Sequence, residues 1–479
     1  MRFGPLRRLW ILPILAVIAA AILFGPRLYR TALVGSGYFA QTLCSGVFVS
    51  GRPMSDVIAT NLAGARFRPL RLFTPTVDAD ARQASAALLG LARQTAIYRE
   101  GLGCTLIHDR PPALLRAETK DLFSGAPSPK ADAEWPEGER VEAGPWTDDF
   151  RWPDGVDSEA ATRAVEAIFA EPSPERPRGT RALVVVRHGR IVAERYAAGF
   201  DAHMPLVGWS MSKAAVNALI GMRIKDGALS LDDTGLLPEW RNGGDARGAI
   251  TLGELMRMTS GLAFDEGYDN DLSDVARMLY LRPDTARFAA SKPLEHRPGS
   301  HWSYSTGTTN IIAGVLRETF DDERTYLHYP RGRLFGPLGM RTAMFAPDAS
   351  GTLMGGAFLY ASARDWARLG LLFLRDGKWG GETLLPEGWV AYSTEPTPQS
   401  PDGEYGAQIW LKPQSEDDVP GEPPMPEDAY YMQGYNGQAV AIVPSRDLVV
   451  VRLGLTPPGG DWNTARDLAP LVTAFPREQ

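Results

Sequence analysis

Residues 208–225 read GWSMSKAAVNALIGMRIK, a short polar stretch that runs directly into an apolar, helix-forming one. Ser210 and Lys213 are three positions apart, so both would lie on one face of a helix that begins here. Such a helix would also direct free backbone N–H groups and its positive end toward Ser210. Apolar residues beside that face predict a helix with one side buried and its other edge at a cleft: 211, 214, 215, 218, 219 and 222.

The pair Ser210 and Lys213 is suited to nucleophilic catalysis. A serine hydroxyl needs a base within hydrogen-bond reach. A lysine can be that base only where burial or a neighbouring cation lowers its pKa. Lowering that pKa from ~10.4 to ~7.5 requires about 4 kcal/mol, which the fold must supply. Because Ser-x-x-Lys is a short motif and a weak signal by itself, other segments have to support it.

Two further segments carry groups that fit such a site. Tyr304 stands in a turn-prone stretch before an apolar helix, and its hydroxyl could relay a proton to a leaving group. Residues 433–438 read QGYNGQ and lead into an apolar strand. A glycine there lets a substrate approach the backbone, and a strand N–H could join that of Ser210 in an oxyanion hole. Taken alone, the first would be interpreted as a buried tyrosine and the second as an ordinary turn.

Strand and helix patterns alternate from residue 161 to 479, which we take as the catalytic region. Two hairpins are expected near its ends: 181–187 with 190–199, and 439–444 with 448–454. Helices are expected before and between them: 158–171, 210–225, 309–319 and 362–376. Strands at both ends with helices inserted between them predict an α+β fold, an antiparallel sheet with a helical subdomain.

Three parts are expected before this region. In residues 1–30, arginines precede an uncharged, mostly apolar run over 10–25, which is typical of a signal sequence or an N-terminal anchor. We favour an uncleaved anchor with the body outside the cytoplasm, over a cleaved signal or a buried core helix. Residues 31–118 are expected to form a small module that includes a helix-like segment, 81–101. Residues 119–160 are rich in proline, glycine and acid, as is a later insert from Gln414, which predicts a linker or a surface wrap.

Composition narrows the function further. The net charge of -7 argues against a nucleic-acid partner, which would require a basic face. The six histidines show no metal-binding spacing, so we expect neither a metal nor another cofactor. Cys44 and Cys104 are the two cysteines, and in an exported protein they would pair. That bond would close a loop of about 60 residues, worth ~4 kcal/mol; two reduced, buried thiols are the alternative.

From about residue 160 to its end the chain resembles the serine beta-lactamase-related family. This family includes class C beta-lactamases, DD-peptidases, family VIII carboxylesterases and 6-aminohexanoate-dimer hydrolases. Its three motifs correspond here to Ser210–Lys213, Tyr304–Thr306 and Tyr435–Gly437. Further similar stretches are IKDGALSLDD (224–233), ITLGELMRMTSGL (250–262) and GGAFLYASARDWARLG (355–370). The resemblance implies a beta-lactamase/transpeptidase-like fold, in which helices sandwich an antiparallel sheet beside an all-helical subdomain.

The resemblance also implies roles for individual residues. Ser210 would be acylated, Lys213 would be the general base, and Tyr304 would assist proton transfer. The N–H groups of Ser210 and Gln438 would form the oxyanion hole, with Gly437 beside it.

Two positions depart from the family pattern, and one loop adds a candidate contact. Thr306 stands where beta-lactamases have asparagine, and Tyr435 where they have the lysine that meets the substrate carboxylate. Without that cation an anionic substrate loses a charge-assisted partner. The segment FDEGYDND (264–271) resembles a cleft-facing region of 6-aminohexanoate-dimer hydrolases, where Asp265 or Tyr268 would read a polar group of the substrate. A solvated acidic loop is the alternative.

The function expected from these residues is hydrolysis of a small-molecule ester or amide, or of a peptide-like substrate. The enzyme would be periplasmic and tethered to the inner membrane. One alternative is a beta-lactamase or DD-peptidase that acts on cell-wall-like substrates. Another uses His203 as the base, although Ser210 lacks a GxSxG elbow. A third is an inactive envelope protein that binds cell-wall fragments.

Overall fold

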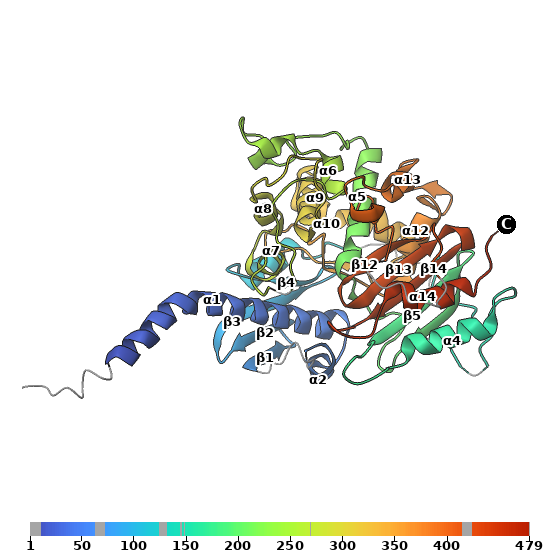
Figure 1. The fold of residues 1–479 in the computed structure, drawn as a ribbon, viewed down its shortest axis with the longest axis horizontal. Helices are drawn as coiled ribbons and strands as arrows, with labels where there is room; N and C mark the ends of the chain where they lie inside the picture. Colours follow the sequence, from blue (N-terminus) through green and yellow to red (C-terminus); the bar gives the residue numbers. More distant parts are fainter. Residues whose placement is uncertain are drawn as a thin grey trace, which may run out of the picture.

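The structure is a computed structural model. It describes the following residues, with side chains from residue 25 onward: 11–62, 72–123, 132–143, 146–147, 149–268, 270–413 and 424–478. A five-stranded antiparallel sheet, in the order β12-β13-β14-β5-β6, forms the centre of the catalytic region (Figure 1). Its strands are β5 Thr180–Arg187, β6 Arg190–Tyr196, β12 Tyr430–Gly434, β13 Gln438–Val443 and β14 Leu448–Gly454. Both predicted hairpins are confirmed, and the pairing of β14 with β5 joins them into one sheet.

Helices cover both faces of this sheet, which explains why β5 and β14 are buried along their whole length. The helices are α4 Ser158–Phe169 and α14 Thr464–Thr473 on one face, and α12 Ala363–Leu374 on the other. Successive side chains of a strand point to opposite faces. Val184 of β5 therefore packs in the cluster of α12, whereas Val185 packs in that of α4 and α14. Helix α12 approaches the sheet closely at Gly370, where a Cβ would lie 2.7 Å from Val449.

A helical subdomain lies beside the sheet. Its helices are α5 Ser212–Lys225, α6 Leu252–Met256, α7 Asp274–Leu281, α8 Thr285–Ala290, α9 Thr306–Glu318 and α10 Glu323–Pro330. Helix α5 is buried on all sides from Ser212 to Met222, so the prediction that only one side is buried is wrong. The reason is its place between the subdomain and the sheet (Figure 1). There Asn217 donates to Ala407 O at 2.8 Å, and Gly221 leaves room for the ring of Trp389.

The N-terminal module combines one long helix with a second antiparallel sheet. Helix α1 (Ile11–Cys44) packs on four strands, β1 Phe73–Asp78, β2 Gln83–Leu88, β3 Leu91–Arg99 and β4 Gly103–Leu106. The helix predicted over 81–101 is wrong, because these residues form β2 and β3 around a turn in which Gly90 has a φ of +80°. Alanine favours helices in isolation. Here Ala84 and Ala96 are instead buried in the same cluster as α1, where small side chains allow the helix to lie close to the sheet.

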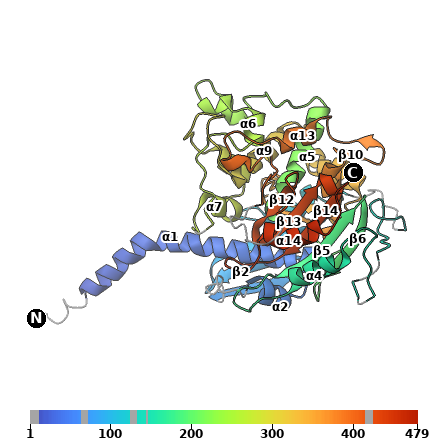
Figure 2. The ribbon, with the colours of Figure 1, turned by 45° about the vertical axis from the view of Figure 1, so that its right-hand side comes forward.

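The C-terminal half of α1 is fastened to the rest of the protein. Cys44 and Cys104 form the disulfide that the sequence predicts, with their Cα atoms 6.1 Å apart. Gln41 donates to Cys104 O at 2.9 Å and to the hydroxyl of Tyr360 in the catalytic region at 3.4 Å. The N-terminal part of α1 projects away from the body in both views (Figure 1, Figure 2). The module and the catalytic region therefore share one buried cluster, from which only the start of α1 extends.

The described part of the proline-rich segment 119–160 runs along α12. Trp135 is buried, and the guanidinium of Arg368 donates to Pro136 O at 3.0 Å and to Gly138 O at 2.6 Å. The second proline-rich insert, expected from Gln414, lies outside the described residues over 414–423.

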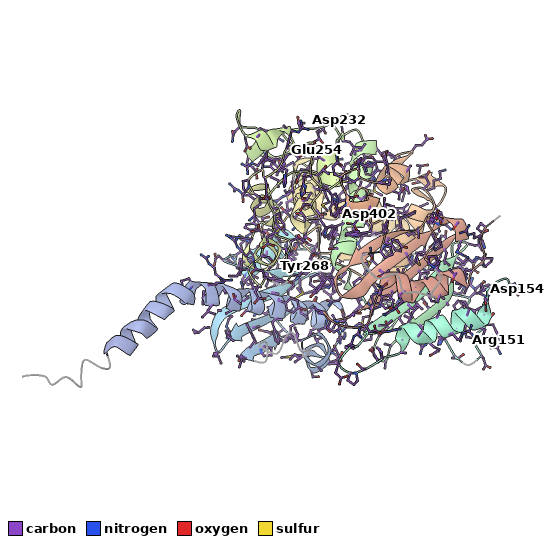
Figure 3. All side chains as sticks on the ribbon, viewed as in Figure 1. Arg151, Asp154, Asp232, Glu254, Tyr268 and Asp402 are labelled. Atoms are coloured by element: carbon purple, nitrogen blue, oxygen red, sulfur yellow. A yellow bond between two sulfur atoms is a disulfide. The ribbon has the colours of Figure 1, made fainter. Side chains whose placement is uncertain are left out.

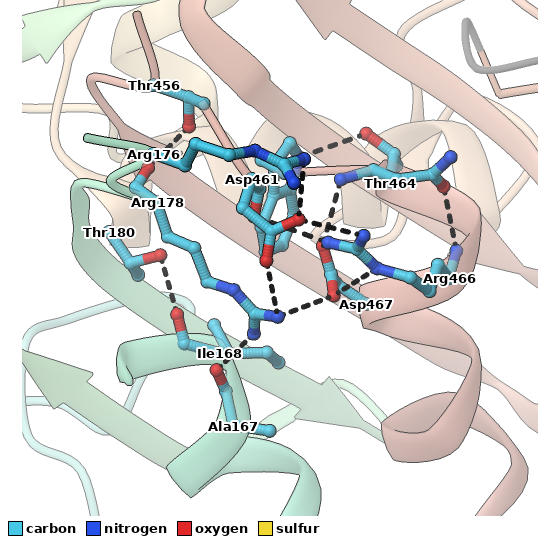
Figure 4. A network of polar contacts seen from close by, with 12 residues as sticks. Ala167, Ile168, Arg176, Arg178, Thr180, Thr456, Asp461, Thr464, Arg466 and Asp467 are labelled. Atoms are coloured by element: carbon cyan, nitrogen blue, oxygen red, sulfur yellow. Dashed lines mark hydrogen bonds and ion pairs between the residues drawn. The ribbon is translucent and has the colours of Figure 1, made fainter. Parts of the chain in front are cut away.

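A network of ion pairs holds α14 against the start of β5 (Figure 4). Arg178, just before β5, lies 3.3 Å from Asp461 and 3.4 Å from Asp467. Arg466 contacts the same two carboxylates at 3.0 and 2.7 Å. All four side chains are largely buried, so the network is part of the packing of this end of the sheet.

Replacing both Cys44 and Cys104 with alanine should lower the free energy of unfolding by about 4 kcal/mol, because the bond closes a loop with a sequence separation of 60. Chemical denaturation of the oxidised protein and of the double variant measures the difference. The reduced wild-type protein is the matched control, and its free energy of unfolding should be lowered by the same amount as that of the variant. Equal stability of all three forms would contradict a structural role for the bond.

Candidate active site

A tight turn carries Ser210 to the start of α5. The turn is a 3₁₀ helix over Trp209–Met211, and the α-helix itself begins at Ser212, two residues after Ser210. Trp209 has a φ of +48°, a conformation uncommon outside glycine. The hydroxyl of Ser212 donates to Trp209 O at 2.6 Å and accepts from Leu359 N at 3.1 Å. The strained turn is thus held in place by hydrogen bonds, and such strain is common at functional sites.

Lys213 lies one turn beyond Ser210 and is almost completely buried. Its ammonium donates to Ser210 Oγ at 3.0 Å, to Thr306 Oγ1 at 3.2 Å and to Gly356 O at 3.2 Å. These three acceptors use all three of its hydrogens. Burial lowers the pKa of Lys213 to about 8, whereas the negative charge of Glu266 raises it. A substantial fraction of this amine is therefore neutral in mildly alkaline water.

Tyr304 lies on the loop before α9, as predicted. Its ring centroid is 4.8 Å from Lys213 Nζ, and its ring packs against that of Trp410 at 5.2 Å. Burial and the charge of Glu266 raise the pKa of the Tyr304 hydroxyl, while a hydrogen bond with Ser210 lowers it. The three groups chosen from sequence, Ser210, Lys213 and Tyr304, therefore meet in one buried cluster.

A carboxylate that sequence reasoning missed also belongs to this cluster. Glu266 accepts from Thr306 N at 2.8 Å, from Thr306 Oγ1 at 2.5 Å and from the hydroxyl of Tyr268 at 2.8 Å. Burial raises the pKa of the Glu266 carboxyl, whereas Lys213 and these hydrogen bonds lower it. Three donors aimed at one carboxyl group favour its ionised form. Glu266 thus lies one hydroxyl group away from the Lys213 amine, and its charged form raises the pKa of that amine.

The adjacent residue chosen from sequence, Asp265, does not enter the site. It is exposed, and its carboxylate accepts from Gly267 N at 2.9 Å within its own loop. Tyr268, the other residue chosen here, does reach the site through its bond to Glu266, although 48% of its surface is exposed. Figure 3 places it where the helical subdomain meets α1. Several acidic residues lie along this loop, and the sequence does not indicate which of their carboxylates points toward the site.

The hairpin between β12 and β13 approaches the Ser210 turn at Gly434 and Tyr435. A Cβ on Gly434 would lie only 2.2 Å from Gly208 O, so the two backbones are in direct contact. The ring of Tyr435 lies 5.8 Å from that of Trp209 and 5.5 Å from that of Tyr268. The predicted site residue Tyr435 is therefore part of the site.

Gly437 and Gln438, which were expected at the oxyanion hole, lie beside β14. The amide of Gln438 donates to Gly454 O at 2.5 Å and accepts from Gly454 N at 3.0 Å. A Cβ on Gly437 would meet the guanidinium of Arg452 at 2.5 Å. Both residues lie past the turn and support β14, so the contact with the Ser210 turn is made three or four residues earlier than the motif alignment implied.

A cavity of about 560 Å³ opens above Ser210. The catalytic region lines it with polar and aromatic groups that include Trp209, Ser210, Tyr268, Thr306 and Tyr435. The opposite wall comes from the N-terminal module, through residues of α1, β1 and β2. The volume is within the range of cavities that enclose small-molecule ligands.

Arginine and lysine are absent among the described residues that line this cavity. Asp271 is the charged residue of the lining, and Glu266 lies just behind Thr306. The arginine that could have replaced the family's lysine at position 435 is thus not found in the described wall. Within the described ranges no cluster of metal-ligating side chains is present either.

His203, the alternative base, lies on the surface. Its side chain is 63% exposed, and its Nδ1 is 3.8 Å from Glu139. Its backbone N–H donates to Asp201 at 2.8 Å, so the two residues form a local turn. The described structure shows no contact between His203 and Ser210.

Comparison with known proteins agrees with this arrangement. The Beta-lactamase family model matches residues 165–473, from α4 to α14. A 6-aminohexanoate-dimer hydrolase of Paenarthrobacter ureafaciens is 25% identical over 308 residues, which are 58% of this chain and 73% of that protein.

Two solved structures show a similar fold. A Bacillus anthracis protein proposed to be a 6-aminohexanoate-dimer hydrolase has a TM-score of 0.51 at 23% identity, covering 62% of this chain and 78% of its own. EstCE1, described as a hydrolase with promiscuous acyltransferase activity, has a TM-score of 0.52 at 17% identity, covering 66% and 98%. The family match excludes the N-terminal module but includes Ser210, Lys213 and Tyr304. Since it spans well over half of the chain and the fold agrees, the chain belongs to the serine beta-lactamase-related family of hydrolases.

Proposed function

We propose that the protein is a serine hydrolase that cleaves an ester or an amide through an acyl-enzyme on Ser210, with Lys213 as the general base. The observation that carries this proposal is the 3.0 Å hydrogen bond between Lys213 Nζ and Ser210 Oγ. It lies in a buried site that lowers the pKa of Lys213 to about 8. A base whose pKa lies near the working pH is the most effective one.

In the proposed acylation step, neutral Lys213 accepts the proton of Ser210 as its Oγ attacks the carbonyl carbon. Backbone N–H groups at Ser210 and at the Gly434–Tyr435 turn stabilise the negative charge that develops on the carbonyl oxygen. The bond to the leaving group then breaks, and the leaving group receives the proton of Lys213 by way of Tyr304. An alcohol or an amine departs, and Ser210 keeps the acyl group.

In the proposed deacylation step, water attacks the same carbonyl carbon and gives a proton to Lys213. Breaking the bond to Oγ returns that proton to Ser210 and releases a carboxylic acid. Both steps use the same base and the same backbone donors, so no additional residue is required.

The charges around the cavity favour a substrate that lacks a carboxylate beside the scissile bond. The described lining offers no cation, and Asp271 within it would repel an anion. A beta-lactam or a D-Ala-D-Ala peptide carries such a carboxylate. This lining therefore supports an esterase or amidase over a beta-lactamase or DD-peptidase.

The hydrolase is further proposed to be held at a membrane with its body outside the cytoplasm. Within the described residues, one helix segment, Gly25–Val49, is long and apolar enough to span a membrane, but 67% of its apolar window is buried against the body. The anchor would thus be the run over 10–25, most of whose side chains lie outside the described set. The disulfide supports an oxidising compartment.

Ser210→Ala should abolish labelling by a fluorophosphonate probe, and Lys213→Ala should lower ester hydrolysis by roughly 10²–10⁴-fold. Intact-protein mass and steady-state kinetics measure the two effects. Lys225→Ala, at the exposed end of the same helix, is the matched control and should behave as the wild type. A folded wild-type protein that is not labelled, or normal activity without Lys213, would refute the assignment.

The pH dependence of kcat/KM should rise through about 8, because only neutral Lys213 accepts the proton. Glu266→Gln removes a negative charge that raises this pKa, so the rising limb should move to lower pH. Asp265→Asn, a neighbouring exposed carboxylate, is the control and should leave the limb in place. A Glu266→Gln profile that coincides with the wild type, or moves to higher pH, would contradict the electrostatic role of Glu266.

The full-length protein, expressed in a bacterial host, should stay in the membrane pellet after alkaline carbonate extraction and should keep residues 1–30 by intact mass. An uncleaved apolar helix resists extraction because its transfer to water is unfavourable. Recovery of a soluble chain that lacks this segment would show a cleaved signal instead.

A further inference from the structure

The wall of the cavity that faces Ser210 is one face of α1 together with the edge of the small sheet. Leu28, Thr31, Gly35 and Tyr38 recur at helical spacing along α1 and line the cavity with Ala32 and Val34. Three residues complete this wall: Leu72 directly before β1, Phe73 at the start of β1 and Leu88 at the end of β2. Apart from Thr31 and the Tyr38 hydroxyl, these side chains offer a substrate only apolar surface.

Two apolar residues of this wall are also left in contact with water. Leu28 is 66% exposed and Leu72 is 57% exposed, and both line the cavity. Large apolar side chains that stay exposed at the edge of a cavity are typical of ligand-binding surfaces. Leu28 belongs to α1, and Leu72 directly precedes β1.

The leaving group and the acyl group of a substrate have different environments here. Tyr304, the proton donor to the leaving group in the proposed reaction, is partly buried and is not among the residues that line this cavity. Ser210 itself does line it. The space between Ser210 and α1 is therefore left for the group that stays bound to Ser210, which is the acyl group.

We propose that the cavity between α1 and the Ser210 turn binds the aliphatic chain of the acyl group, so that the substrates are esters or amides of fatty acids of medium length. This inference rests on the proposed hydrolase function. Each methylene group moved from water to an apolar wall contributes up to roughly 0.8 kcal/mol, so specificity should increase with chain length until the cavity is filled. The N-terminal module is thereby the specificity-determining part of the enzyme.

A series of p-nitrophenyl esters from acetate to dodecanoate tests this on the full-length protein. We expect kcat/KM to rise at least tenfold from acetate to octanoate. Thr31→Trp fills the cavity and should lower octanoate hydrolysis at least tenfold while acetate hydrolysis stays within about twofold of the wild type. Arg30→Trp adds the same bulk at the adjacent exposed position, which does not line the cavity, and should change neither rate.

A second variant keeps the test decisive if Thr31→Trp does not fold. Leu28→Asp places a charge at the exposed mouth, where it cannot disturb a core, and should also weaken octanoate hydrolysis selectively through KM. The inference is overturned if acetate is the best substrate of the wild type, or if Thr31→Trp and Leu28→Asp lower both rates equally. Absence of any turnover together with absence of a Ser210 adduct would instead refute the hydrolase proposal itself.

The same acyl chain could reach the cavity from water or from a membrane. To separate these routes, the membrane-bound enzyme is given two substrates in turn. One is an octanoyl ester in free solution, and the other is a monoacylglycerol in phosphatidylcholine vesicles. If one substrate is turned over faster and Thr31→Trp removes that advantage, the result supports acyl-chain binding in the cavity. The faster substrate then identifies whether the acyl chain enters from water or from the membrane. Turnover of both at a rate that Thr31→Trp leaves unchanged overturns it.

Discussion

The burial of the Lys213 amine is the constraint on which the rest of the catalytic region depends. An amine in water holds its proton too firmly to act as a base near neutral pH, and here it is the loss of hydration that lowers its pKa. Helix α5 is accordingly enclosed on every side and not on one side, as an amphipathic surface helix would be. Complete enclosure in turn demands that each hydrogen of the ammonium find an acceptor, which Ser210, Thr306 and Gly356 supply.

Thr306 explains how the carboxyl group of Glu266 can lie near Lys213 without cancelling the lowering of the Lys213 pKa by burial. Its hydroxyl accepts from Lys213 at 3.2 Å and donates to Glu266 at 2.5 Å, so it separates the two charges while connecting them. Direct contact with Glu266 would raise the pKa of the amine back toward its ordinary value. A hydroxyl oxygen can accept and donate at once, so a single atom of Thr306 connects the amine and the carboxyl group.

The sequence predicted those features that follow from short-range periodicity. The valine runs of β5 and β14 identified the sheet, and the spacing of Ser210 and Lys213 placed them on one turn. The helix predicted over 81–101 was wrong because an alanine-rich stretch has helical propensity in isolation. In this protein the small alanine side chains instead let α1 approach the sheet closely. Glu266 was missed in favour of its neighbour Asp265, since the direction of a loop side chain depends on distant partners, here the N–H and hydroxyl of Thr306.

Chemistry and cavity shape come from different parts of this chain. Ser210, Lys213 and Tyr304 all lie within the region that matches the beta-lactamase family, whereas the wall opposite Ser210 lies in residues before that match. That wall is held by a disulfide and by a buried cluster shared with the catalytic region. In the proposed reaction, the family motifs supply the groups that break the bond, and the N-terminal module supplies the wall that selects the acyl chain.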